Sequence, residues 1–246
     1  MMALAPGWLA GRSSLSRPAL RPLLAGLLLA VSLLALPIDS RSAEDGSAEE
    51  VAAVVAKVQR RYDDTRDFEA RFSQDLVLAA GGQTIESKGR VWFRRPGKMR
   101  WEYETPDAQT IVADGKHLWV YHPADGQVLR SPLVDAFQAA APASFLLGVA
   151  RLDQTFTARR LEAGKSGQVR LELKPREAGE AADLGTLVLE VDAESFDLRA
   201  AVVRDPLGNQ TRVELHEMSR NRGLDDQRFR FVPPKGADVI EAPGAP

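Results

Sequence analysis

The chain has 246 residues, of which 44% are hydrophobic and 27% charged, and this composition is typical of one globular domain with a sizeable core. A formal net charge of −2 gives no field strong enough to recruit nucleic acid or anionic lipid by bulk electrostatics. The absence of cysteine excludes disulfides, thiolate metal sites, a cysteine nucleophile and lipid attachment through a cysteine thiol.

The first forty residues have the features of a secretory signal. Three arginines precede an apolar run: Arg12, Arg17 and Arg21. The run, Leu23–Leu36, is shorter than the roughly 20 residues that a membrane-spanning helix needs, although a membrane anchor is the alternative interpretation. We predict a signal peptide over residues 1–42, cleaved between Arg41 and Glu44, and one mature domain over residues 43–246.

A helix and a long strand are predicted next. In EEVAAVVAKVQRRY the valines recur with helical spacing, which predicts an amphipathic helix over Glu49–Tyr62. The pattern then changes to alternation in DFEARFSQDLVL, where Phe68 and Phe72 share one face. A strand therefore follows the helix and ends before the turn at Gly81-Gly82.

Further strands follow in hairpin rhythm and form an antiparallel meander. They are predicted at Thr84–Arg94, Lys98–Glu104, Gln109–Ala113, Lys116–Tyr121 and Gln127–Arg130. The turns between them are predicted at Pro96-Gly97, Pro106-Asp107, Asp114-Gly115 and Asp125-Gly126.

The rhythm breaks at SPLVDAFQAAAPASFLLGVARL, which favours two short helices within Leu133–Val149, interrupted by Pro142. Strands then resume at Thr155–Leu161, Val169–Pro175, Thr186–Asp192, Leu198–Arg204, Thr211–Met218 and Arg228–Val232. The fold class is mainly β (α+β), a barrel or curled antiparallel sheet of about a dozen strands. Because a sheet of this size cannot fill its inner face with its own side chains, the helices are expected over an apolar cavity.

Large side chains crowd the hairpin GRVWFRRPGKMRWEYETP, and we expect several of them to line this cavity. The expected lining residues are Trp92, Met99, Trp101, Tyr103, Phe72, Phe145 and Leu146. The alternative is that these side chains are ordinary core residues and cross-strand pairs.

The segments DFEARFSQ, GRVWFRRPGKMRWEYETPDAQTIVADGKHLWVYHP, PASFLLG and FRFVPPKG together resemble the periplasmic lipoprotein carrier family, LolA. The resemblance runs in order from about Ala48 to Gly236. It implies an unclosed antiparallel β-barrel whose helices form a lid over a cavity for lipoprotein acyl chains. It also implies transfer from an inner-membrane ABC transporter to the outer-membrane receptor LolB, without covalent chemistry or a cofactor.

The resemblance also assigns a role to Arg95, directly before Pro96. In the family this arginine hydrogen-bonds backbone of the helical lid in the closed, empty state. A guanidinium at an apolar mouth needs acceptors, and helix C-termini supply unpaired carbonyls. The alternative is that Arg94 and Arg95 are solvated turn residues.

Other functions find less support in the residues. His117, His122 and His216 with Asp114 and Asp125 lack the spacing of metal ligands. The basic spots ARRL and RNRG lack the interleaved aromatic residues of nucleic-acid sites, and no Gly-x-Ser-x-Gly motif marks a hydrolase. An envelope lipid sensor and a glycolipid carrier remain alternatives, and we expect a monomeric periplasmic protein that is not an enzyme.

Overall fold

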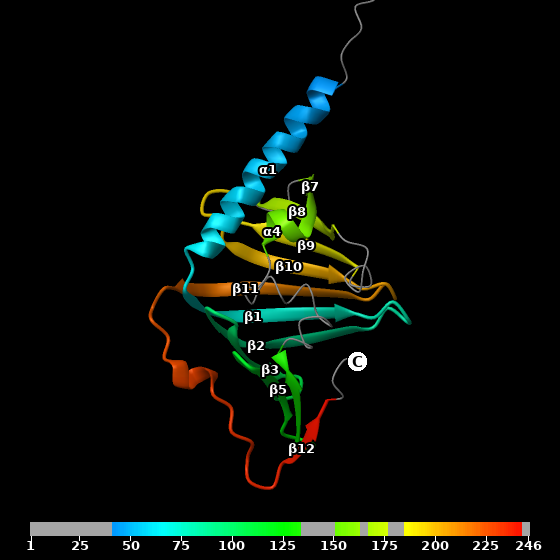
Figure 1. Ribbon diagram of the computed structural model, residues 1–246. Coiled ribbons are helices and arrows are strands. Elements are labelled where there is room, and N and C mark those ends of the chain that lie inside the picture. Colours follow the sequence, from blue (N-terminus) through cyan, green and yellow to red (C-terminus); the bar gives the residue numbers. More distant parts are fainter. Residues whose placement is uncertain (1–40, 134–150, 163–166, 177–184, 243–246) are drawn as a thin grey trace, which may run out of the picture. The chain divides into compact units, whose positions relative to one another are not determined.

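The computed structural model describes residues 41–133, 151–162, 167–176 and 185–242, and Figure 1 shows their strands in one large sheet. The sheet is 12-stranded, with the order β12-β6-β5-β4-β3-β2-β1-β11-β10-β9-β8-β7. Six strands precede the gap at residues 134–150. They are β1 (Asp67–Val77), β2 (Thr84–Arg94), β3 (Lys98–Thr105), β4 (Gln109–Asp114), β5 (His117–His122) and β6 (Gln127–Pro132). Those after it are β7 (Phe156–Leu161), β8 (Val169–Pro175), β9 (Thr186–Val191), β10 (Leu198–Arg204), β11 (Gln210–Arg220) and β12 (Asp238–Glu241).

The sheet is curled and unclosed, and its two edge strands are β12 and β7. Neighbouring strands are antiparallel, except that β12 runs parallel to β6. The first and last long strands of the meander, β1 and β11, pair at the centre, with Phe72 opposite Leu215. The predicted fold class, mainly β with a curled antiparallel sheet, is therefore confirmed.

Alternation along each strand gives the sheet two different faces. We call the face that carries Phe72, Val91 and Trp101 the inner face and the opposite one the outer face. Inner-face residues pair across strands, since Phe72 lies opposite Gly89 and Val91 opposite Trp101. Outer-face positions of the same strands carry mostly charged residues, so one face of the sheet is apolar and the other polar.

One helix, α1 (Arg41–Asp63), covers part of the inner face. Its Val55 and Val58 join a buried cluster with Leu171 of β8 and Leu189 of β9. Figure 1 shows α1 on the side of the sheet where β7 to β10 lie. Burial of this valine stripe explains why the sequence folds as a helix here, since isolated helical propensity alone stabilises a helix only weakly.

The helix begins at Arg41 rather than at Glu49, so the predicted start was wrong. The apolar periodicity begins only at Val51. The preceding residues Ala43, Glu44 and Asp45 are compatible with a helix and extend α1 toward the N-terminus. The two helices predicted within Leu133–Val149 lie outside the described residues except for Leu133. The predicted signal peptide falls almost wholly outside them as well.

The last segment of the chain crosses the outer face. The strand predicted at Arg228–Val232 was wrong, because Asp226–Phe229 forms a single 3-10 turn, η3, and the backbone after it is irregular. Phe229 is 1% exposed, and the ring of Phe231 lies 5.6 Å from that of Trp119. These aromatic side chains pack onto the sheet instead of alternating within it. The chain then adds β12, which was not predicted, along β6 (Figure 1).

Candidate functional site

An aromatic cluster forms the centre of the inner face on β1 to β3. The ring centre of Phe72 lies 4.8 Å from that of Trp101 and 4.9 Å from that of Tyr103, both in edge-to-face geometry. Phe72 is 2% exposed, whereas Trp101 and Tyr103 are half-buried. The structure therefore brings together three of the predicted lining residues. The Phe72 ring is buried, and the rings of Trp101 and Tyr103 pack against it and stay partly exposed.

Gly89 makes this arrangement possible. A Cβ atom added there would lie 2.8 Å from Cε1 of Phe72 and 2.0 Å from the backbone oxygen of Glu102. Gly89 pairs with Phe72 on one side and with Tyr103 on the other. A side chain at this position would occupy the space that the phenylalanine ring fills, so glycine is required for close approach rather than for a turn.

The cluster has one polar end. The Tyr103 hydroxyl donates a hydrogen bond to Oε1 of Gln74 at 3.0 Å. Burial raises the pKa of the Tyr103 phenol above its ordinary value, so the hydroxyl stays protonated at neutral pH. At this point the described part of the inner face presents aromatic carbon, the neutral Tyr103 hydroxyl and the Gln74 amide.

The apolar surface continues from β3 to the edge of the sheet. Met99 and Leu118 pack, half-buried, against the buried Ala113 and Leu133. Further along, Leu129 of β6 is 41% exposed and Ile240 of β12 is 43% exposed, and the two lie opposite each other. Partly open apolar side chains therefore follow the inner face from its centre to the β12 edge.

Trp92 does not belong to this surface, and its predicted place among the lining residues was wrong. Its indole N–H donates to Oε2 of Glu69 at 3.1 Å, and the Arg228 guanidinium carbon lies 4.8 Å from the ring centre. Trp92 alternates with the inner-face residues Val91 and Phe93, so it faces outward beneath the C-terminal segment. The predicted lining residues Phe145 and Leu146 lie outside the described residues.

Arg95 lies at the corner between β2 and β3 and contacts the last turn of α1. Its guanidinium carbon is 4.5 Å from the ring centre of Tyr62, and Nη2 is 3.3 Å from Oδ1 of Asp63. The Arg95 side chain is 27% exposed, and its buried Nε has no hydrogen-bond partner among the described residues. Burial raises the pKa of Tyr62, although the nearby Arg95 charge opposes that shift.

Arg94 points the other way. Its Nη1 donates to the backbone oxygen of Leu224 at 2.7 Å and lies 3.4 Å from Oδ1 of Asp226. Both partners belong to the segment that crosses the outer face. The two neighbouring arginines thus serve different sides of the sheet, which matches the alternation expected from the sequence.

Two contact residues of Arg95 were not identified from the sequence. Tyr62 was predicted only as part of the apolar stripe of a helix, and Asp63 follows it without any motif. The helical pattern could have placed Tyr62 near the sheet, but no signal in the sequence pairs position 63 with position 95. That contact depends on how α1 meets the β2–β3 corner.

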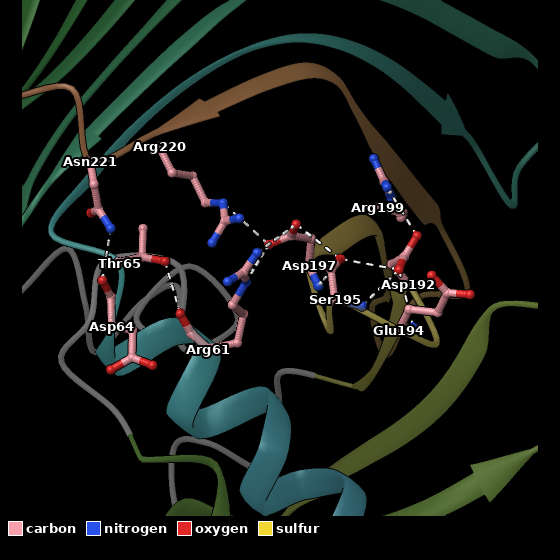
Figure 2. Close-up of polar contacts among 10 residues, drawn as sticks. All are labelled: Arg61, Asp64, Thr65, Asp192, Glu194, Ser195, Asp197, Arg199, Arg220 and Asn221. Carbon is pink, nitrogen blue, oxygen red and sulfur yellow. Dashed lines mark hydrogen bonds and ion pairs between the residues drawn. The ribbon is translucent and has the colours of Figure 1, made fainter.

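The last turn of α1 is also tied to the turn between β9 and β10 (Figure 2). Arg61 donates through Nε and Nη2 to the two carboxylate oxygens of Asp197, at 2.8 and 3.1 Å. Nε of Arg220 lies 3.3 Å from the same carboxylate, and the Ser195 hydroxyl donates to it at 3.0 Å. Burial raises the pKa of Asp197, but the Arg61 and Ser195 hydrogen bonds and the Arg220 charge outweigh burial and lower the pKa overall.

A groove of about 440 Å³ runs along α1 on the side of β7. Val51, Val55 and Phe156 line it, together with the charged side chains of Arg60 and Arg151. This groove lies beside the edge strand β7, whereas the aromatic cluster lies on β1 to β3, so the two are separate. None of the predicted lining residues that the structure describes lines this groove.

The three histidines have different partners: His117 and His122 lie at the two ends of β5, and His216 lies on β11. Nε2 of His117 is 2.9 Å from Nη2 of Arg130, His122 contacts Gln109, and His216 contacts Ser73. Within the described ranges, no three potential ligands gather where a metal ion could bind. No helix in the same ranges is long and apolar enough to cross a membrane.

Known protein sequences match most of this chain. A family model described as outer membrane lipoprotein carrier protein LolA matches residues 63–232. An outer-membrane lipoprotein carrier protein of Alkalilimnicola ehrlichii is 36% identical over 219 residues, covering 89% of this chain and 94% of that protein. One from Halorhodospira halophila is 38% identical over 184 residues, covering 74% of this chain and 82% of that protein.

Solved structures are more distant. An uncharacterized conserved protein from Thermus thermophilus has a TM-score of 0.49 at 16% identity, covering 78% of this chain and 99% of that one. A LolA superfamily protein from Nitrosomonas europaea has a TM-score of 0.43 at 15% identity, covering 74% and 97%.

Proposed function

Because the chain belongs to the outer-membrane lipoprotein carrier family, LolA, we propose that it binds the acyl chains of lipoproteins on the inner face of β1 to β6. The resemblance noted in the sequence is thereby confirmed at the level of the family. The observation that supports this site is the partly open apolar surface that runs from Trp101 to Leu129 and Ile240.

The energetic need for such a surface follows from the cargo. Each acyl methylene exposed to water costs about 0.8 kcal/mol, so one long chain costs on the order of 10 kcal/mol. A lipoprotein therefore does not cross an aqueous compartment by itself at a useful rate. A carrier offsets this cost by covering the chains with apolar side chains of its own.

The chemistry of the inner face suits binding that must later be reversed. Met99 is flexible and adapts to different shapes, and the rings of Trp101 and Tyr103 offer flat apolar area without charge. Half-buried side chains also contribute less binding free energy per contact than the side chains of a closed core would. Loose, adaptable contacts favour a carrier that releases its cargo over one that stores it.

The partners follow from the same proposal. Cargo would come from an inner-membrane lipoprotein-releasing ABC transporter and pass to an outer-membrane receptor such as LolB. The protein would act as a monomer in the periplasm after removal of residues 1–42. Its family is one of carriers rather than enzymes, and the work it performs is binding and transfer without a cofactor.

Arg95 would fasten the lid through α1. Its contacts with Tyr62 and Asp63 hold the last turn of the helix against the β2–β3 corner. Cargo on the inner face of β1 to β3 that pushes the last turn of α1 away from the β2–β3 corner would break these contacts and leave the guanidinium to water. The closed, empty state would therefore gain stability from Arg95, and cargo release would be favoured by the same amount.

Native mass spectrometry of protein purified from its own cell envelope tests the proposal. We expect a lipoprotein or its acylated peptide to remain bound in part of the sample. A bound glycolipid would instead favour the glycolipid carrier, and empty protein with hydrolytic activity would contradict the carrier function.

A further inference from the structure

Gln59 is a buried amide on α1 that connects two distant parts of the chain. The residue is 5% exposed. Its Oε1 accepts a hydrogen bond from the backbone N–H of Leu152 at 2.9 Å, and its Nε2 donates to Oδ1 of Asp63 at 3.1 Å. Leu152, which is 1% exposed, is the first residue of the short helix α4 (Leu152–Thr155).

Only an amide satisfies both neighbours of Gln59. The Leu152 N–H is a donor and cannot accept, whereas the ionised Asp63 carboxylate accepts and cannot donate. The amide therefore has one orientation, with oxygen toward Leu152 and nitrogen toward Asp63. A buried amide that loses either partner is left with an unsatisfied polar atom, so the two hydrogen bonds depend on each other.

The same carboxylate oxygen of Asp63 faces Arg95. Nη2 of Arg95 lies 3.3 Å from it, and the guanidinium rests on Tyr62, the neighbour of Asp63. A continuous series of contacts thus runs from Leu152 through Gln59 and Asp63 to Arg95. It joins the start of α4, the end of α1 and the β2–β3 corner.

Arg95 depends on this series for its position. Its buried Nε has no hydrogen-bond partner among the described residues, so the guanidinium is held through Nη2 at Asp63 and through the Tyr62 ring. The Asp63 side chain is 45% exposed and has room to turn toward water. The hydrogen bond from Gln59 opposes that rotation and keeps the carboxylate directed at the corner.

We propose that Gln59 is a positioning residue for Arg95, which couples the backbone at Leu152 to the contact between α1 and the β2–β3 corner. When Leu152 moves away from α1, the Gln59 side-chain oxygen loses its hydrogen bond from the Leu152 N–H. Gln59 then no longer holds Asp63, which turns toward water, and Arg95 loses its ion pair with Asp63. The consequence for cargo rests on the proposed function: displacement of the chain at α4 would unfasten Arg95 without touching it.

Amide hydrogen exchange at Leu152, followed by NMR, tests the coupling without any ligand. Arg95→Leu should speed exchange of the Leu152 amide by about fivefold, although the two residues do not touch. Arg94→Leu is the matched control and should leave it unchanged, because Arg94 contacts the C-terminal segment on the outer face. Equal exchange in the two variants would overturn the proposal.

Two further variants locate the coupling. Asp63→Ala should speed Leu152 exchange and abolish any further effect of Arg95→Leu. Gln59→Leu removes both hydrogen bonds, so the Leu152 amide should exchange faster and become insensitive to Arg95→Leu. Continued sensitivity to Arg95 in either background would show that the coupling takes another route and that Gln59 has only a structural role.

The release rate of a fluorescent long-chain fatty acid separates this proposal from the proposed function. Gln59→Leu and Arg95→Leu should slow release to a similar extent, and the double variant should be no slower than Arg95→Leu alone. Coupled amide exchange with unchanged release would support the positioning role and count against the carrier function. Additive effects on release would contradict a shared route.

Discussion

The two halves of the inner face differ in how completely their apolar side chains are buried. Under α1, Leu171 of β8 and Leu189 of β9 are 0% exposed. On the other half, Phe72 and Val91 of β1 and β2 are also buried, but on β3 to β6 Trp101 and Val120 are half-buried and Leu129 is 41% exposed. Both halves arise from the same alternating pattern, so a helix covering one half, rather than the strands themselves, makes the difference.

This difference divides stability from binding. A fully buried leucine contributes about 2 to 3 kcal/mol through burial, and packed interiors tolerate little change in volume. A half-exposed apolar side chain contributes less to folding and keeps area available for a ligand. The β7–β11 half, together with the buried Phe72, Val91 and Phe93 of β1 and β2, holds the fold together, and the partly open side chains of β3 to β6 are free to change their contacts.

The strongest test of this division replaces one leucine in each half by alanine. Leu189→Ala should lower the free energy of unfolding by about 3 kcal/mol, because it leaves a cavity in a closed core. Leu129→Ala, the same change at a 41% exposed position, should cost less than about 1 kcal/mol. Urea denaturation measures both values, and similar losses would mean that the halves are packed alike.

The next test introduces a charge on the binding half. Trp101→Glu should weaken binding of a long-chain fatty acid at least about tenfold, because an ionised carboxylate is costly beside an acyl chain. Met99→Glu should act in the same direction. Binding is measured by displacement of an apolar fluorescent dye from folded protein.

The control is Lys88→Glu, an exposed outer-face position on β2. It should leave fatty-acid binding unchanged. If a folded Trp101→Glu variant binds as well as the Lys88→Glu variant, the ligand does not occupy the inner face near Phe72.

The sequence was sufficient to predict most strands because each carries alternation between clear turns. The bounds of β2 and β8 match the predicted Thr84–Arg94 and Val169–Pro175, and the sheet class is confirmed. Alternation failed at Arg228–Val232, where Phe229 and Phe231 have strand spacing but pack onto the outer face. The short β12 is too brief and too mixed in composition to give a signal of its own.

The site was harder to predict, because face assignment needs the strand register. Met99, Trp101 and Tyr103 share one face, but Trp92 in the same hairpin lies on the other, where Glu69 accepts its N–H. Composition alone cannot separate them. Gln59 and Asp63 were missed for a different reason, since their partners lie on other elements and follow no motif.

The Arg95→Leu variant tests the contact between the last turn of α1 and the β2–β3 corner. The variant should fold normally, because an ion pair with a 45% exposed aspartate and a stacking contact contribute only about 1 kcal/mol. That energy stabilises the closed, empty state, so the variant should load cargo but release it about fivefold more slowly. Transfer from loaded carrier to receptor gives the rate, and Arg94→Leu should transfer at the normal rate.

The smallest expected effect concerns the ion pair that fixes α1 over the packed half. The Asp197 carboxyl has a pKa below its ordinary value in the folded protein, despite burial, because Arg61, Ser195 and Arg220 favour its charged form. The unfolded chain therefore binds the proton first as the pH falls. The resulting stability is present above about pH 4 and is lost as the pH drops through the lowered pKa.

Asp197→Asn should therefore reduce the free energy of unfolding at neutral pH by at most about 1 kcal/mol and flatten its decline in acid. Urea denaturation at about pH 6 and about pH 3 measures both effects. Asp153→Asn is the control, since its partner Arg151 is an exposed neighbour two residues away rather than a residue of another element. Because Val55 and Val58 of α1 are buried against β8 and β9, away from Trp101 and Leu129, fatty-acid binding by folded Asp197→Asn should stay normal at neutral pH. Loss of binding along with stability would show that the two halves depend on α1 equally, and the division between them would not hold.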